Sequence, residues 1–203
     1  LMANQVDGII SGSHNLGIEE YHQLTAPIVS FDRYLADNIP IIAADSYHGG
    51  ELSAKYLVEH DVKHLAVIVD EDTSVSPTIN RIQGALDFLN KQKRDFEPLA
   101  IQHLDLEATF PGDYDGVLAS NDVQALTITN LYYQAGKQIN KDFFITGYDG
   151  SRLIRKVAPY LPTVIQPIPL LAHELIETLM KRIETPHEKI ETKLVPVEFY
   201  QPK

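Results

Sequence analysis

Polar side chains follow six of the short apolar runs in this sequence, each at the point where the run ends. These groups are Ser11 to His14, Asp32-Arg33, Asp45-Ser46, Ser120 to Asp122, Asp149-Gly150 and Gln166. Their carboxylates, amides and hydroxyls provide the hydrogen-bond donors and acceptors needed to bind a polar small molecule. In a parallel sheet the carboxyl ends of the strands meet at one edge, where ligands bind. The spacing therefore predicts one polar pocket.

Catalysis needs a more specific arrangement of side chains. His14 lies near Ser11 and Ser13, but the sequence identifies no acid that would orient the histidine in a triad. There is no Gly-x-Ser-x-Gly elbow, and residues 12–17 lack the Lys and Ser or Thr of a phosphate loop. We therefore expect a binding protein and not an enzyme.

A metal site is not expected either. His60 and His64 are four residues apart, as in a zinc-binding helix, but Asp61 stands where that motif has Glu. The segment is also typical of a helix-to-strand turn with solvated histidines. We predict no metal and no cofactor.

The composition is that of a soluble globular protein. The chain has 203 residues, 44% of them hydrophobic and 22% charged, and no apolar run approaches the ~20 residues of a membrane helix. With 17 Lys and Arg against 28 Asp and Glu, its net charge of -11 repels a polyanion such as DNA. The absence of cysteine is compatible with the cytoplasm. The first residues lack a secretory signal and suggest a fragment of a longer protein.

Strands and helices alternate along the sequence. Apolar or β-branched runs predict strands at 6–11, 28–31, 41–44, 65–69, 99–102, 116–120, 143–147, 163–165 and 194–199. Apolar residues at helical spacing predict helices over 79–89 after Pro77, over 128–135 and over 172–183. This order predicts an α/β fold with parallel sheets and right-handed crossovers. The link 103–115 barely holds a crossover helix, so it is either irregular or lacks residues.

Seven blocks in fixed order resemble the core of the lactose/galactose-repressor family of transcription regulators. They are Val6 to Ile10, Pro27 to Arg33, Asp45 to Gly50, Arg81 to Gly84, Asp115 to Leu126, Ile145 to Gly150 and Pro162 to Pro167. The least degenerate contain Ala-Ser-Asn-Asp and Gly-Tyr-Asp, and together the blocks cover nearly the whole chain. The phrase from Phe31 to Leu35 also resembles sucrose- or fructose-operon repressors.

The resemblance implies two Rossmann-like lobes with parallel sheets, joined by three crossovers, with a ligand cleft between the lobes. Residues 1–44 plus 167–186 would form the N-terminal lobe, and residues 45–166 plus 187–203 the C-terminal lobe. The family's DNA-binding headpiece, hinge helix, and first strand and helix have no counterpart in this sequence. We therefore expect operator DNA to bind a missing N-terminal headpiece.

The resemblance also implies a sugar site, because sugar hydroxyls suit a pocket that combines carboxylates, amides and a guanidinium fork. The matching residues are Ser11, Asp32, Arg81, Asn121, Asp149 and Gln166. Plainer roles remain open. Arg81 could be a solvated helix arginine and Gln166 a surface crossover residue, while Asp32 could pair with Arg33 on the surface.

Two of these residues are also candidate helix caps. Asp149 could cap the helix that begins near Ser151. Asn121 could cap the helix after Ser120 as well as bind ligand, although Asp122 is the better capping candidate.

The chain departs from the family pattern at two places. Where the family usually has Gly in a helix-to-strand turn, this chain has Asp61, and we expect it in a left-handed conformation. Where the family often stacks an aromatic ring on the sugar, this chain has Leu106, with Phe110 nearby. The identity of the sugar is therefore not set by the resemblance.

The implied function is the effector-sensing core of a bacterial transcription repressor. It would be a cytoplasmic homodimer, without membrane contact, whose operator affinity changes when a small carbohydrate binds. One alternative is a solute-binding protein of a sugar transporter, which would have an upstream signal peptide. Another is a catabolite-control regulator that answers to a protein corepressor. A basic helix-turn-helix upstream would favour the repressor.

Overall fold

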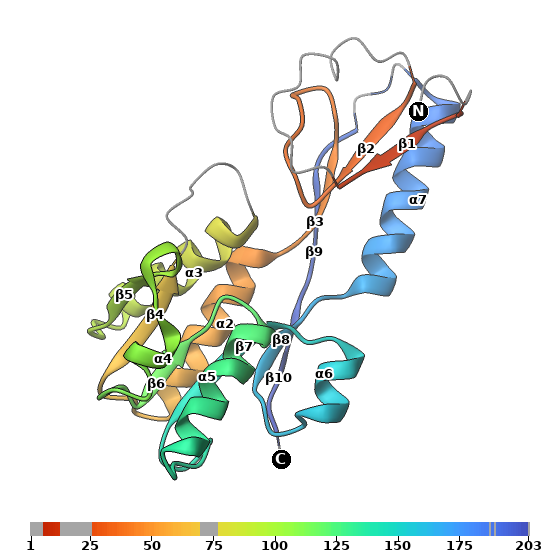
Figure 1. Ribbon diagram of the computed structural model, residues 1–203. Helices are drawn as coiled ribbons and strands as arrows, with labels where there is room; N and C mark the ends of the chain where they lie inside the picture. Colours follow the sequence, from red (N-terminus) through yellow and green to blue (C-terminus); the bar gives the residue numbers. More distant parts are fainter. Residues whose placement is uncertain (1–5, 13–25, 70–76, 187, 189, 203) are drawn as a thin grey trace. The chain divides into compact units, whose positions relative to one another are not determined.

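The computed structural model describes residues 6–12, 26–69, 77–186, 188 and 190–202, which form two compact units (Figure 1). Within this part of the chain, the first unit holds residues up to 45, residues 167–196 and Pro77. The second unit holds the remaining residues. The chain leaves one unit for the other after Asp45, after Gln166 and after Pro196.

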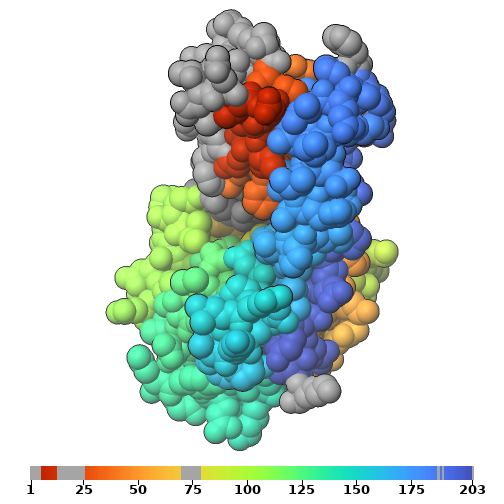
Figure 2. Space-filling view, turned by 90° about the vertical axis from the view of Figure 1, so that its right-hand side faces the viewer, coloured from red at the N-terminus to blue at the C-terminus, as the bar shows by residue number. Residues whose placement is uncertain are grey.

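The first unit is a parallel four-stranded sheet with a long helix packed on it. Its strands are β1 (Ile9–Ser11), β2 (Ile28–Phe31), β3 (Ile41–Ala44) and β9 (Lys193–Val195), in that spatial order. Helix α7 (Ile168–Glu184) contacts β1, β2 and β3, and Figure 2 shows β1 beside α7 on one face of the unit. One buried cluster of this unit consists of Ile9 of β1, Ile28 of β2, and Leu35, Ala36 and Ile39 from the segment between β2 and β3.

The second unit contains a six-stranded sheet in the order β10-β8-β7-β6-β4-β5. Its strands are β4 (Leu65–Val69), β5 (Glu97–Ala100), β6 (Gly116–Leu118), β7 (Phe144–Asp149), β8 (Thr163–Ile165) and β10 (Glu198–Tyr200). Its helices are α2 (Ser46–Glu59), α3 (Pro77–Lys91), the 3-10 turn η2 (Ile101–His103), α4 (Leu106–Thr109), α5 (Asp122–Gln134) and α6 (Arg152–Val157). All pairings in this sheet are parallel except β10 with β8.

Helices cover both faces of this sheet, which explains its unbroken apolar strands. Along β4, Leu65 and Val67 belong to the core formed with α2 and α3, whereas Ala66 and Ile68 belong to the core that includes residues of α5. Successive strand residues point to opposite faces, so burial on both faces requires every position to be apolar. The α/β fold with parallel sheets predicted from the sequence is confirmed.

The strand order places a switch point beside β4. The chain goes from β4 to β5 on one side, returns past β4 to β6 on the other side, and continues to β7, so the direction of strand addition reverses between β4 and β6. In open α/β sheets, ligands bind outside the carboxyl ends of strands at such a point. A ligand site is therefore expected among the residues at the carboxyl ends of β5, β6 and β7.

Several predicted boundaries need correction. The strand expected at 99–102 is β5 at Glu97–Ala100, and Ile101–His103 forms the η2 turn instead. The link to β6 is irregular, with only the four-residue helix α4. The strand expected at 194–199 is two strands, β9 and β10, which belong to different sheets. Pro196 lies between them and has no N–H to continue a ladder.

The same break at Pro196 changes the expected division of the chain. Residues 187–203 were all expected in the second lobe, but the described residues among 187–196 group with the first unit. Asp61 has a φ of 53°, the left-handed conformation expected for it at the end of α2. Among the described residues, no helix combines the length and apolar character needed to cross a membrane.

Candidate functional site

Arg81 is a buried cation at the start of α3 in the second unit. Its residue is only 8% exposed, and its guanidinium carbon lies 3.2 Å from the centre of the Tyr148 ring. One terminal nitrogen donates to the backbone oxygen of Ser120, and the other lies 3.9 Å from Oδ1 of Asp149. The alternative of a solvated helix arginine is therefore wrong. The planar guanidinium is fixed by a ring on its face and acceptors at its edge.

Two glycines hold α3 close enough to α2 to place Arg81 there. A Cβ at Gly84 would lie 2.0 Å from the backbone oxygen of Tyr47, and a Cβ at Gly50 would lie 1.8 Å from that of Arg81. Both distances are far below van der Waals contact. The Arg81-x-x-Gly84 block therefore combines a buried cation with the contact that positions its helix.

Asp149 ends β7 and presents a half-exposed carboxylate, with 49% of its side chain accessible. Its φ is 105°, in the region that L-residues rarely adopt. Gln166, just after β8, donates from Nε2 to Asp149 Oδ1 at 2.9 Å and from its backbone N to Asp149 O at 3.1 Å. The helix that follows is capped by Ser151, so Asp149 is not its cap.

Asn121 caps α5 and also faces a pocket. Its side-chain oxygen accepts from the backbone N of Gln124 at 2.9 Å, and its amide nitrogen lies 3.5 Å from Ser120 Oγ. The expectation that Asp122 would be the better cap is wrong. A cap side chain must reach back to the first free amides of its own helix, whereas Asp122 turns into the protein and bonds to Gly150 and Thr163.

Burial changes the acidity of Asp122, which is 2% exposed. Burial, with a smaller contribution from the negative charge of Asp149, raises the pKa of this carboxyl to about 6. Hydrogen bonds from Thr163, Gly150 and Ser151 oppose that rise by stabilising the ionised form. A carboxylate with this pKa titrates close to neutrality.

A cavity of about 500 Å³ lies next to these groups, within the second unit. Its lining residues are Ile101, Leu104, Leu106, Asn121, Val123, Gln124, Thr127 and Asp149. The aliphatic side chains come from η2, α4 and their link, and from Val123 of α5. Asn121 and Asp149 come from the ends of β6 and β7. This combination suits a molecule with both hydroxyl groups and apolar C–H faces. Leu106 lines the cavity, whereas Phe110 is 3% exposed and belongs to the core.

The structure therefore brings Arg81, Asn121, Asp149 and Gln166 together at the carboxyl ends of β6, β7 and β8. Their role in binding a ligand remains a prediction. Among the described residues, no group of three or more His, Asp or Glu is placed to hold a metal ion. The arrangement and charges of these four side chains favour reversible hydrogen bonding to a polar molecule.

The other two predicted residues, Ser11 and Asp32, belong to the first unit. Ser11 ends β1, and its backbone oxygen lies 3.5 Å from Ser30 Oγ. Asp32 follows β2 with a φ of 59°, and its backbone N donates to Ile42 O at 3.0 Å. They follow neighbouring parallel strands, as the sequence pattern indicated. Ser13 and His14 lie outside the described residues.

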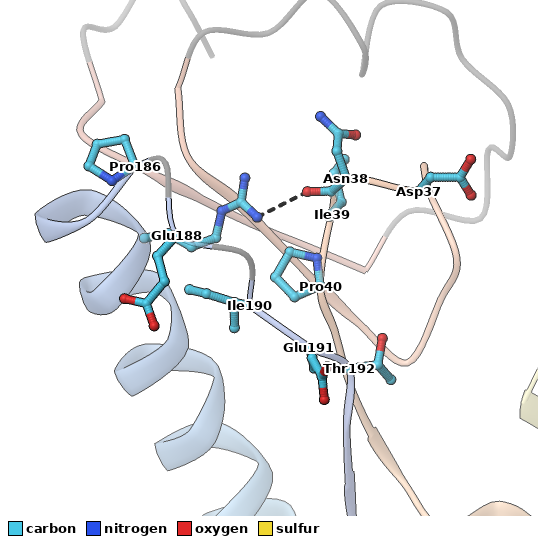
Figure 3. Close-up of a pocket in the computed structure, with 10 residues that line it drawn as sticks. Asp37, Asn38, Ile39, Pro40, Pro186, Glu188, Ile190, Glu191 and Thr192 are labelled. Carbon is cyan, nitrogen blue, oxygen red and sulfur yellow. Dashed lines mark hydrogen bonds between the residues drawn. The ribbon is translucent and has the colours of Figure 1, made fainter.

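The first unit has a cavity of its own, of about 560 Å³, where β3 begins (Figure 3). Arg182 of α7 donates to the backbone oxygen of Asn38 at 3.0 Å, and burial lowers the pKa of this arginine. Figure 3 shows the carboxylates of Asp37 and Glu188 at opposite sides of the cavity. Neither Ser11 nor Asp32 lines it, so it is separate from the predicted site.

Sequence reasoning missed Tyr148 and Ser120 as partners of Arg81, and Ile101 and Leu104 as pocket residues. Tyr148 lies in the Gly-Tyr-Asp block, directly before Asp149, and that adjacency was a usable signal. Residues 101 and 102 were predicted as strand but belong to the η2 turn, and Ile101 of that turn lines the cavity. The contact between Ser120 and Arg81 spans 39 residues and has no sequence signature.

Comparison with known proteins gives a consistent result. The chain matches the periplasmic binding protein-like domain family over residues 54–201. It is 36% identical over 200 residues to a sucrose operon repressor of Streptococcus mutans, covering 91% of this chain and 59% of that protein. It is 34% identical over 209 residues to a ribose operon repressor of Halalkalibacterium halodurans, covering 96% of this chain and 62% of that protein. The chain thus spans about three fifths of these curated relatives.

Solved structures give the same picture. A periplasmic binding protein/LacI transcriptional regulator from Alkaliphilus metalliredigens, complexed with D-xylulofuranose, matches with a TM-score of 0.85 and 27% identity. The match covers 99% of this chain and 78% of that one. A LacI family regulator from Enterococcus faecium with bound ribose matches with a TM-score of 0.84 over 99% of this chain and 81% of that one. Its 22% identity supports the fold alone.

Proposed function

Because this chain belongs to the periplasmic binding protein-like domain family, we propose that it is the effector-sensing core of a bacterial sugar-operon repressor. The relatives named above are transcription repressors and not enzymes. One observation carries the proposal: Arg81, Asn121, Asp149 and Gln166 come from four separate segments and meet beside one cavity. A cation, a carboxylate and two amides form the donor and acceptor set that sugar hydroxyls require.

The proposed effector is a small sugar, held by its hydroxyls at Asn121 and Asp149. The aliphatic wall that includes Leu106 would contact the C–H groups of the sugar. Arg81 would act through a charged hydrogen bond and through its hold on the Asp149 carboxylate. Ser11 and Asp32 of the first unit are proposed to contribute further hydrogen bonds.

A thermal-shift screen followed by calorimetry tests the sugar site. Sucrose, D-fructose, D-ribose and D-xylulose form the panel, and a sugar at 100 times its Kd stabilises the native state by about 2.7 kcal/mol. We expect Arg81→Ala to weaken binding at least tenfold, since a charged hydrogen bond contributes roughly 1.5–3 kcal/mol. Lys91→Ala, at the exposed end of the same helix, is the charge-matched control. Equal affinity of Arg81→Ala and wild type would remove Arg81 from the site.

Operator DNA is proposed to bind an N-terminal headpiece of the full-length protein, in the cytoplasm. Relatives are longer than this chain, and the chain's own net charge of -11 opposes DNA binding. Band-shift assays with the full-length protein should show operator binding that changes with the sugar. The chain alone should not bind DNA.

The repressor is further proposed to be a homodimer. Leu153 and Val157, one turn apart on α6, are 67% and 62% exposed, and Figure 2 shows α6 on the surface of the second unit. An apolar pair of this kind is covered when two copies associate. Sedimentation equilibrium should give the mass of two chains, and a monomer mass at micromolar concentration would contradict the proposal.

A further inference from the structure

A buried carboxylate lies directly behind the proposed sugar ligand Asp149. Asp122, the first residue of α5, accepts at Oδ2 from the backbone N of Gly150 at 2.8 Å. It accepts at Oδ1 from Thr163 Oγ1 at 2.6 Å. A Cβ at Gly147 would lie 2.3 Å from Oδ1, so only glycine at that position admits the carboxylate. Gly150, Thr163 and Gly147 thus all accommodate the Asp122 side chain, although this side chain does not line the cavity.

The hydrogen bond to Gly150 belongs to a clamp on the bend that carries Asp149. Arg155 Nε donates to Gly150 O at 2.9 Å, and the backbone N of Gln166 donates to Asp149 O at 3.1 Å. The φ angles are 105° at Asp149 and 54° at Gly150. A residue stays in so rarely populated a conformation only when its surroundings hold it there. Asp122 provides the buried and charged part of that hold.

We propose that Asp122 is a positioning residue of the effector site, which fixes the Asp149 carboxylate for sugar binding through the amide of Gly150. The inference rests on the proposed function and deepens it, because it assigns a role to a residue outside the cavity. When the Gly150 bond is lost, Asp149 can relax towards an ordinary conformation. Its carboxylate then leaves the position shared with Arg81 and Gln166. Sugar affinity falls although every residue that touches the sugar is still present.

Ionisation of Asp122 makes this positioning sensitive to pH. The groups that face it are Thr163 on β8, the amides of Gly150 and Ser151, and the carboxylate of Asp149. Arg155 donates to the Gly150 carbonyl, and Arg81 lies beside Asp149. Burial raises the pKa of Asp122 to about 6. Protonation replaces a charge-assisted bond to the Gly150 amide by a weaker neutral one.

The expected size of the pH effect follows from that value. When only the ionised form supports tight binding, the apparent Kd is the intrinsic Kd divided by the ionised fraction. With a pKa of about 6, roughly a quarter of Asp122 is ionised at pH 5.5 and nearly all at pH 7.5. Sugar affinity should therefore be about fourfold weaker at pH 5.5 than at pH 7.5.

The test measures sugar affinity and local protection separately. Calorimetry with D-fructose, sucrose and D-ribose is run at pH 5.5, 6.5 and 7.5 on the wild type, Asp122→Asn and the exposed control Asp113→Asn. Amide exchange at Gly150 is followed by NMR without sugar. We expect Asp122→Asn to bind about tenfold more weakly at pH 7.5, to lose the fourfold pH dependence and to exchange Gly150 faster. Asp113→Asn should behave as the wild type does.

Each outcome separates this inference from the proposed function. If the wild type and Asp122→Asn bind a sugar equally well, with the same pH profile, the positioning role is overturned and the sugar site stands. If the wild type binds none of the three sugars, the proposed function fails. In that case, equal amide exchange of Gly150 in Asp122→Asn and wild type also refutes the role of Asp122 in holding the Asp149 bend. If Asp122→Asn does not fold, the wild-type data decide. The inference is also overturned if the wild type binds sugar with the same affinity from pH 5.5 to 7.5 and its Gly150 amide loses no protection from exchange below pH 6.

Discussion

The contact between α2 and α3 offers a sharp test of how the fold positions Arg81. In Gly84→Ala, the new Cβ would lie 2.0 Å from the backbone oxygen of Tyr47, so the two helices must separate by about 1 Å. A backbone carbonyl cannot rotate away as a side chain can. Such overpacking costs about 1–3 kcal/mol, or more where the backbone must move. Alanine gains about 1 kcal/mol over glycine in a helix, which offsets part of that cost.

We expect Gly84→Ala to be less stable than the wild type by about 1–3 kcal/mol, with a Tm lower by roughly 3–10 °C. Sugar affinity should fall as well, because Arg81 lies one turn earlier in the same helix. Urea unfolding and calorimetry measure the two effects. Asn90→Ala, an exposed position of α3, is the control and should stay within about 0.5 kcal/mol of the wild type. A Gly84→Ala protein as stable as the wild type, or more stable, would refute the close approach of the helices.

Two further predictions concern stability. Phe143→Ala should lower the free energy of unfolding, measured in urea, by about 3–5 kcal/mol. The wild-type ring is fully buried and stacks on Tyr132, with the ring centroids 4.0 Å apart. A decrease below about 1 kcal/mol would contradict that packing. The Asp122 carboxyl has a folded-state pKa of about 6 against an ordinary value of 3.8, so the folded state binds a proton more tightly and stability is lost as pH rises through 6. When the pH is lowered from 7 to 5, the free energy of unfolding of the wild type should rise by about 1 kcal/mol relative to that of Asp122→Asn. If both proteins show the same dependence of stability on pH, Asp122 is not buried as described.

The strands that sequence reasoning located best are those buried on both faces. β2, β3, β4 and β8 lie at the predicted residues, because an uninterrupted apolar run has only one possible placement in a two-sided core. β5 was misplaced by two residues. It is the edge strand next to β4, and its exposed first residues Glu97 and Pro98 give no apolar signal. A single sequence defines an edge strand poorly because half of its environment is solvent.

The site was predictable to the extent that it follows from strand ends. Asp149 is the last residue of β7, and Asn121 and Gln166 come just after β6 and β8. Parallel pairing alone brings these strand ends together. What the sequence could not supply is the direction of a side chain. Asp122 was expected to cap α5, yet its partners are 28 and 41 residues away. Neither distance leaves a periodic pattern, so the exchange of roles between Asn121 and Asp122 appears only in three dimensions.

Backbone conformation separates the two acidic site residues from other strained positions. Of the described residues other than glycine, Asp32, Asp61, Lys93, Asn140 and Asp149 have positive φ. Asp61 and Lys93 follow helices, and Asn140 lies in a turn, where a left-handed residue reverses the chain. Asp32 instead comes directly after β2, and Asp149 is the last residue of β7. A residue keeps so rarely populated a conformation only where its surroundings hold it, and such residues cluster at ligand-binding positions. This is the physical reason to predict that each of the two acidic residues, in its own unit, contributes to binding a ligand.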